Sequence, residues 1–98
     1  MAYFNCIVRN TSEEISNIFG QWDTISDIKT QRQWNSCTPD GISFYIYDYK
    51  ENRRIGENDT CDYHIGTRTK EDSINVMNWL NSIGLHALEK KYLFNFVT

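Results

Sequence analysis

The sequence contains little proline and glycine. Of its 98 residues, 1 is proline and 5 are glycine, while 40% are hydrophobic and 14% are aromatic. This composition excludes collagen-like and linker-like chains, and it argues against general disorder because enough apolar material is present for a core. No apolar run approaches the roughly 18 residues of a membrane-spanning helix, so we expect no membrane association. The length accommodates a single domain over residues 1–98.

A surplus of positive charge is also missing. Lys and Arg number 10 against 13 Asp and Glu, which gives a net charge of −3. A domain dedicated to duplex nucleic acid normally carries a basic excess, so this function class is disfavoured. The charges are interspersed rather than gathered into acidic blocks, which argues against a mimic of DNA.

Cysteines are few and form no recognisable pattern. The sequence has 3 of them, Cys6, Cys37 and Cys61, at long spacings and without a C-x-x-C pair. This arrangement predicts neither a zinc site nor a disulfide framework, and no motif suggests a cofactor. The first residues lack a basic stretch followed by an apolar one, so we expect no signal peptide and a reduced, cytoplasmic location.

The hydrophobic periodicities predict an α+β domain in the order β-α-β-β-α-β. The expected strands are residues 2–9, 42–49, 61–69 and 86–97, and the expected helices are residues 12–21 and 70–83. This order is that of the ferredoxin-like split-βαβ fold, in which a four-stranded antiparallel sheet carries two helices on one face. Because that fold hosts unrelated activities, it carries little functional information.

Local signals mark the ends of several elements. Thr11 and Glu14 have the spacing of a capping box, and Thr69 is suited to cap the second helix. Gly84 lies where a left-handed residue commonly ends a helix. Residues 21–40 follow neither periodicity and are expected to form an irregular insertion. The insertion should end in a turn at residues 38–41, Thr-Pro-Asp-Gly.

The same periodicities predict a core between the helices and the sheet. The residues expected to be buried there are Ile15, Ile18, Phe19, Phe44, Ile46, Ile65, Met77 and Leu80.

A row of tyrosines is the first candidate binding surface. Tyr45, Tyr47 and Tyr49 alternate with apolar residues and should point to the sheet face away from the helices, beside His64 and Arg68. Such a face could stack nucleic-acid bases, form a protein interface or simply cover the sheet. The strand expected at 61–69 lacks the aromatic pattern of RNA-recognition modules, which disfavours that assignment.

The polar stretch 50–60 is the second candidate. It carries Arg53 and Arg54 and has neither EF-hand nor P-loop spacing. We expect either a solvated loop or a protruding recognition loop. Together, the residues predicted to bind a partner are Tyr45, Tyr47, Tyr49, His64, Arg68, Arg53 and Arg54.

The sequence gives little support for a catalytic site. His64 and His86 could act as an acid–base pair in a small ribonuclease, but such enzymes need a basic groove, and this chain is acidic. Cys37 lacks the neighbouring groups of a nucleophile. Residues 10–13 replace the Gly-rich phosphate loop of acylphosphatases, which share this length and topology. We therefore expect no catalytic residues.

These exclusions predict a small non-enzymatic inhibitor that masks a macromolecular partner. With 11 Ile and 10 Asn but 2 Ala, the residue usage is typical of AT-rich genomes. It suggests a phage or mobile-element protein, such as an anti-CRISPR-like or other anti-defence inhibitor directed at a host defence complex in the host cytoplasm, or an immunity protein. The alternative is a binder of single-stranded nucleic acid or a nucleotide through Tyr45, Tyr47, His64 and Arg68.

Self-association is a further expectation left open. The terminal strand, from Leu88 to Val97, should lie at a sheet edge, and Phe94 and Phe96 are apolar there. An undefended apolar edge favours pairing with a second chain. A homodimer through this edge or through the tyrosine face would be isologous in its simplest form.

Overall fold

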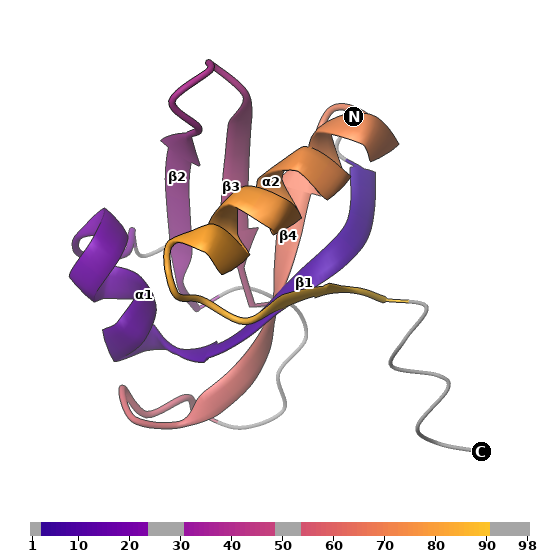
Figure 1. Ribbon diagram of the computed structural model, residues 1–98. Coiled ribbons are helices and arrows are strands. Elements are labelled where there is room, and N and C mark those ends of the chain that lie inside the picture. Colours follow the sequence, from indigo (N-terminus) through magenta and orange to yellow (C-terminus); the bar gives the residue numbers. More distant parts are fainter. Residues whose placement is uncertain (1–2, 24–30, 49–53, 91–98) are drawn as a thin grey trace.

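One antiparallel sheet forms the centre of the protein (Figure 1). The computed structural model describes residues 3–23, 31–48 and 54–90. Within these ranges the sheet has five strands, which in spatial order are β2 (Gln33–Cys37), β3 (Ser43–Tyr47), β4 (Thr60–Thr67), β1 (Tyr3–Thr11) and β5 (Ala87–Glu89). Every neighbouring pair is antiparallel. The protein is thus a small α+β domain, as the sequence predicted.

The first helix, α1 (Ser12–Phe19), begins at the predicted capping box. The Glu14 N–H donates to Thr11 Oγ1 at 3.1 Å, and the Thr11 N–H donates to Glu14 Oε1 at 2.9 Å. These reciprocal bonds satisfy two donors that a helix start would otherwise leave unpaired. They also lower the pKa of Glu14, with the Thr11 backbone bond as the largest cause.

The second helix, α2 (Lys70–Ser82), has the predicted signals at both ends. The Asp72 N–H donates to Thr69 Oγ1 at 3.0 Å, so Thr69 is the N-cap. Gly84 adopts a φ of 102°, and the Leu85 N–H donates to the Leu80 carbonyl at 3.1 Å. This is the Schellman arrangement, in which a left-handed glycine lets the chain reverse while it satisfies terminal carbonyls.

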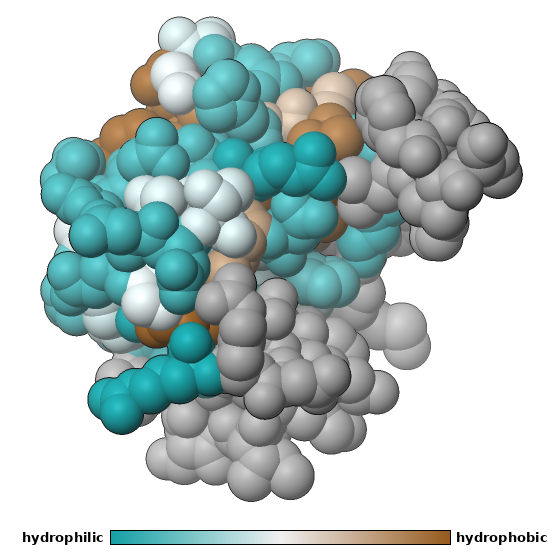
Figure 2. All heavy atoms as spheres, turned by 90° about the horizontal axis from the view of Figure 1, so that it is seen from below, coloured by the Kyte–Doolittle hydropathy of each residue, from teal (hydrophilic) through white to brown (hydrophobic). Residues whose placement is uncertain are grey.

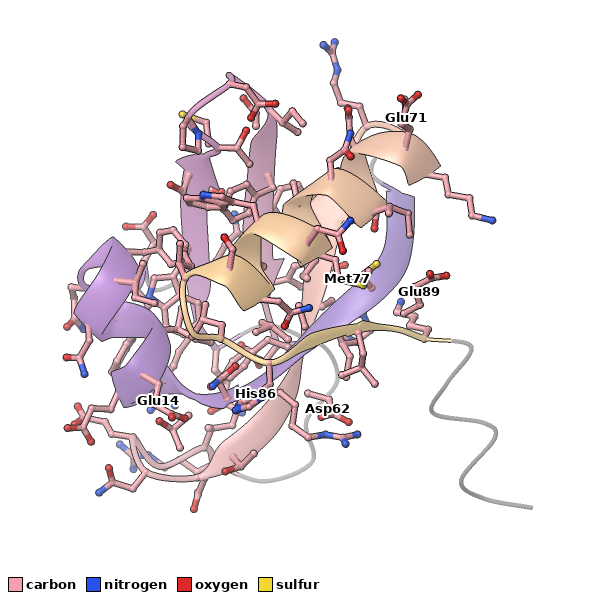
Figure 3. All side chains as sticks on the ribbon, in the orientation of Figure 1. Glu14, Asp62, Glu71, Met77, His86 and Glu89 are labelled. Carbon is pink, nitrogen blue, oxygen red and sulfur yellow. The ribbon has the colours of Figure 1, made fainter. Side chains whose placement is uncertain are left out.

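Both helices cover the same face of the sheet. Figure 1 shows α2 lying across the strands, and the ring of Phe19 in α1 contacts those of Phe44 in β3 and Trp79 in α2, with centroids 5.8 and 6.1 Å apart. Met77 extends from α2 toward β1, where its sulfur lies 3.9 Å from the Cys6 sulfur (Figure 3). The core therefore lies in this single layer between helices and sheet.

The predicted core is largely confirmed. Five of its members are buried, namely Ile15, Phe44, Ile46, Ile65 and Leu80. Phe19 and Met77 are partly buried against them. Ile18 was predicted to be buried and this is wrong, because its side chain is 41% exposed. Ser12, Ile15 and Phe19 lie on the side of α1 that faces the core, and Ile18 falls off that stripe.

The sheet has one strand more than the four that the sequence predicted. The additional strand is β2, which lies within the insertion expected to be irregular and pairs with β3 from Gln33↔Tyr47 to Cys37↔Ser43. Trp34 anchors it, since this side chain is 2% exposed and its Nε1 donates to the Gly20 carbonyl at 3.1 Å. Residues 24–30 of the insertion lie outside the described residues.

The predicted turn that follows β2 is present. The Gly41 N–H donates to the Thr38 carbonyl at 2.9 Å, and Gly41 has a φ of 94°. A positive φ is easily adopted by glycine because it lacks a Cβ atom. The turn returns the chain directly into β3 and so fixes the β2–β3 register.

A buried carboxylate connects the start of β2 to the end of β3. Asp48 is 1% exposed, and it accepts the backbone N–H groups of Gln31 at 2.9 Å and Arg32 at 2.7 Å. Arg32 in turn donates from Nη2 to the Ile55 carbonyl at 2.6 Å, and its guanidinium carbon lies 4.3 Å from the Trp22 ring centroid. These contacts satisfy the buried acid and hold residues 31–32 and 55 against the sheet.

The last strand is described only in part. β5 pairs with β1 from Val8↔Ala87 to Cys6↔Glu89 and lies at an edge of the sheet, as expected for the terminal strand. The remainder of the predicted strand beyond residue 90, including Phe94 and Phe96, lies outside the described residues.

Candidate binding surface

Three predicted site residues meet on the sheet face opposite the helices, which we call the outer face. Phe44 and Ile46 point into the core, so alternation along β3 places Tyr45 and Tyr47 on the outer face. The β3–β4 register sets His64 opposite Tyr47. The ring centroids of Tyr45 and Tyr47 are 5.3 Å apart, and those of Tyr47 and His64 are 5.4 Å apart and stacked.

The members of this aromatic row differ in accessibility. Tyr45 and His64 are half-buried, whereas Tyr47 is 8% exposed. Tyr47 therefore acts as packing within the row, and Tyr45 at one end offers ring surface to a ligand. Tyr49, which was predicted to extend the row, lies outside the described residues.

Gly66 allows the Tyr45 ring to lie close to β4. The two residues are directly opposite in the β3–β4 ladder. A Cβ atom built at Gly66 would lie 2.6 Å from Tyr45 Cζ and 2.7 Å from Cε2, distances too short for carbon atoms. The ring thus occupies the space that any other residue at 66 would fill. Sequence reasoning missed Gly66, although a glycine within an alternating strand is a recognised sign of close approach.

A notch opens beside Tyr45 where β3 and β4 separate. Their pairing ends at Tyr45↔Gly66, and β4 ends at Thr67 before the chain enters α2, while β3 reaches back to Ser43. The resulting cavity has a volume of about 820 Å³. Its lining residues come from β2, β3, β4, the first turn of α2, and the connections between β2 and β3 and between β4 and α2. They are Asn35, Ser36, Gly41, Ile42, Ser43, Phe44, Tyr45, Gly66, Thr67, Arg68 and Asp72.

The notch combines an aromatic wall with charges of both signs. Tyr45 supplies ring surface, and Arg68 and Asp72 supply one positive and one negative group. Arg68 was predicted to share the face of the tyrosines, and it lines the notch together with Tyr45. A cavity of this size, lined by both apolar and polar residues, is a candidate site for a ligand or for a side chain of a partner.

Charged groups of both signs lie around the rest of the aromatic row. Burial, and to a smaller extent the nearby Lys90, lowers the pKa of His64, so this imidazole is neutral at pH 7. Arg9 is paired with Asp62, with Nε to Oδ1 at 2.7 Å, and this hydrogen bond raises the pKa of the guanidinium. Arg9 and Asp62 thus offset each other's charge beside the aromatic row.

The loop predicted to carry Arg53 and Arg54 is fastened to the domain at its described end. Arg54 is exposed and Arg53 lies outside the described residues. The side chain of Ile55 is buried, and the Glu57 carbonyl accepts from the Glu13 N–H at 3.2 Å. The described part of this loop, residues 54–59, thus lies against α1. In the view of Figure 2, the hydrophobic residues of the described part of the chain reach the surface in small separate areas.

The residues considered for a ribonuclease do not form one site. Tyr63 points into the core, and burial raises the pKa of its hydroxyl to about 12, while its neighbour His64 points to the outer face. His86 is exposed beside the C-terminal part of β1, where the Arg9 N–H donates to its carbonyl, and it lies on the side of Glu14 in the first turn of α1 (Figure 3). Across residues 3–23, 31–48 and 54–90, no three His, Cys, Asp or Glu side chains are grouped as a metal site would require.

Comparison with known proteins adds no functional information. None of the helices in the described ranges has the length and apolar character needed to cross a membrane. The chain matches no family model, no curated protein and no solved structure.

Proposed function

We propose that this chain is a non-catalytic protein-binding domain that masks its partner by taking one of the partner's side chains into the notch. The observation that carries the proposal is the position of Tyr45, a half-buried ring that forms a wall of a cavity of about 820 Å³. Tyrosine is enriched among the residues that dominate the energetics of protein interfaces, because its rigid ring adds contact area at low entropic cost.

The charge around the notch supports a protein partner over nucleic acid. Arg68 is balanced by Asp72 among the lining residues, and the chain has a net charge of −3. Nucleic-acid affinity depends mainly on cations that neutralise phosphates. In addition, Tyr47 is almost fully packed between Tyr45 and His64, which leaves little ring surface for successive bases to stack on.

The architecture is proposed to be a ferredoxin-like unit with an added edge strand. The four strands β3-β4-β1-β5 support this. The connection from β1 to β3, which contains α1 and β2, passes β4, and the connection from β4 to β5, which contains α2, passes β1. Such interleaved connections define the split βαβ arrangement. In this reading β2 extends the unit, and its residues Asn35 and Ser36 complete the notch.

The biological setting that we propose is the host cytoplasm, with the protein acting as a phage or mobile-element inhibitor of a host defence complex. The exposed thiol of Cys37 supports a reducing compartment. The AT-rich residue usage is the basis for the proposed origin.

The test is affinity capture from bacterial lysates with the wild type, Tyr45→Ala and Ile18→Ala. Ile18 is exposed on α1 and does not line the notch, so it is the matched control. We expect one stoichiometric protein to be retained by wild type and Ile18→Ala. Tyr45→Ala should weaken its binding by roughly 30-fold, which corresponds to the loss of a hot-spot side chain of about 2 kcal/mol.

Two outcomes would overturn this function. Equal capture by Tyr45→Ala and wild type would place the interface elsewhere. Binding of single-stranded oligonucleotides at low salt, measured by fluorescence anisotropy and lost in Tyr45→Ala, would instead support the sheet-face nucleic-acid binder.

A further inference from the structure

The outer edge of β2 has backbone groups that the described part of the chain does not pair. β2 is the end strand of the sheet, and alternate residues of a strand direct their N–H and C=O groups to opposite edges. The Thr38 N–H donates to the Ile42 carbonyl at 2.9 Å, so the backbone groups of Thr38 point inward, toward β3. The N–H and C=O of Gln33 bond to Asp23 instead and so point outward, away from β3. Asn35 and Cys37 share the direction of Gln33, so their N–H and C=O groups point outward as well.

This edge also lacks the usual protection against strand pairing. The β2 sequence Gln-Trp-Asn-Ser-Cys contains no charged residue and no proline. Natural edge strands are commonly blunted by lysine, proline or a bulge. At the opposite edge of the sheet, β5 contains Glu89 and is followed by Lys90. Of the two described edges, β2 is therefore the one suited to accept another strand.

We propose that β2 pairs antiparallel with β2 of a second copy of this chain, around a two-fold axis at Ser36. In this register Asn35 lies opposite Cys37 of the second copy, and the reverse pair forms on the other side of the axis. Each outward N–H then meets an outward carbonyl, and the sheets of the two copies become continuous. The proposal concerns the protein alone and does not depend on the notch binding a partner.

The neighbouring residues exclude the other registers. An axis at Asn35 would need the N–H and C=O of Gln33, which are already bonded to Asp23 at 3.2 and 2.8 Å. An axis at Cys37 would bring Pro39 opposite Asn35, and proline has no N–H to donate. With the two-fold axis at Ser36, the hydrogen bonds between the two copies involve only the backbone N–H and C=O groups of Asn35 and Cys37.

The shape of β2 favours a second copy over a longer foreign strand. The free edge is short, because Asp23 occupies the space beside Gln33. A copy of β2 has the same short length, since its chain turns away at residues 38–41. It therefore leaves the edge before it would reach Asp23, whereas an extended peptide would continue into that residue.

The pairing would bring the two notches next to each other. Asn35 lines the notch, and directly opposite residues of an antiparallel pair point to the same face of the sheet. Cys37 of the second copy would therefore border the notch at Asn35. A dimer of this form presents its two binding surfaces on one face.

The experiment measures molecular mass against concentration by sedimentation equilibrium for wild type, Asn35→Pro and Asn35→Ala. The Asn35 N–H points outward, so proline there removes a donor of the dimer without removing one from the β2–β3 ladder. We expect wild type and Asn35→Ala to dimerise at high micromolar concentration. The dissociation constant of Asn35→Pro should rise at least tenfold. Far-UV circular dichroism and urea midpoints establish that each variant is folded.

A second pair of variants covers the case in which Asn35→Pro does not fold. Cys37 is exposed, so Cys37→Lys adds charge at the edge and Cys37→Ser serves as its neutral match. Only the lysine variant should remain monomeric. A short bismaleimide should also cross-link wild type, because Cys6 and Cys61 are buried. The two Cys37 residues lie on a diagonal of about 7–8 Å, beyond the usual reach of a disulfide.

Two results would overturn the proposal. One is a wild type that stays monomeric throughout the concentration range, which would leave this edge to some other strand or to none. The other is a dimer that persists unchanged in folded Asn35→Pro and Cys37→Lys, which would locate the interface at β5 or on the outer face.

Discussion

The contact between Gly66 and Tyr45 makes a sharp prediction for the variant Gly66→Ala. The new methyl group would lie 2.6–3.0 Å from the Tyr45 ring atoms, so the ring must move away from β4. Because the ring is half-buried and can swing outward, the cost should lie near the lower end of the usual overpacking range of about 1–3 kcal/mol. The displaced ring would also lose its place in the wall of the notch.

Without the Tyr45 ring, Gly66→Ala should stabilise the protein instead of destabilising it. In a Tyr45→Ala background the clash is absent, and Gly66 does not have a positive φ. Alanine should then stabilise the protein by about 0.4–1 kcal/mol, because it restricts the unfolded chain more than glycine does. The coupling between the two positions is therefore expected to be about 1.4–2 kcal/mol.

Urea unfolding of wild type, both single variants and the double variant measures this coupling. The slope of the transition should be the same for all four proteins, so that differences in midpoint report stability. If Gly66→Ala destabilised the two backgrounds equally, the close approach of the ring to β4 would not be what selects glycine at this position.

Three further predictions test the core, a helix cap and a titrating group. Leu80→Ala should lower the free energy of unfolding by about 2–5 kcal/mol, since Leu80 is fully buried. Ile18→Ala should change it little, because Ile18 is exposed. Equal urea midpoints for the two variants would contradict this assignment of the buried and exposed sides of the helices. Thr69→Ala should cost about 1 kcal/mol, whereas Thr69→Ser keeps the hydroxyl that caps Asp72, and thermal melts should separate them. His64 has a pKa below its ordinary value of 6.5, so the unfolded chain takes up the proton first and stability should fall as pH decreases below about 6.5. His64→Gln should remove this part of the pH dependence, and an unchanged profile would show that the burial of His64 does not govern it.

The helix ends could be predicted from the sequence because their signals are local. Thr11 with Glu14, Thr69, and Gly84 each act within a few residues, and all of them take the expected roles. Ile18 was misplaced because α1 is short and spacing alone does not fix which side of a helical stripe meets the sheet. The caps depend on neighbours in the chain, whereas the facing side of α1 depends on tertiary packing.

The strand β2 was not predicted because its sequence contains a single residue, Trp34, that signals burial. Trp34 is its one fully buried side chain, and residues 33 and 35 on either side are polar. An edge strand with an outward polar face gives too few apolar alternations to stand out from a loop. Asp48 was equally invisible, since the backbone N–H groups that it accepts lie 16 and 17 residues away along the chain.

The candidate site could be predicted in its chemistry but not in its shape. Alternation correctly grouped Tyr45, Tyr47 and His64 on one face. The notch depends on β4 ending opposite the middle of β3, which is a matter of register that no local pattern reveals. Gly66 and Asn35 therefore gained their roles only once the strands were paired.

The interior position of β1 has a consequence for how the chain is made. The two partners of β1 are β4, which begins at Thr60, and β5, which begins at Ala87. During synthesis β1 must therefore wait for residues 60–67 before it can pair with β4, and for residues 87–89 before it can pair with β5. Closing contacts over such sequence distances costs chain entropy and slows folding. Until residues 60–67 have been synthesised, β1 has neither of these partner strands, and its backbone N–H and C=O groups can pair with other chains.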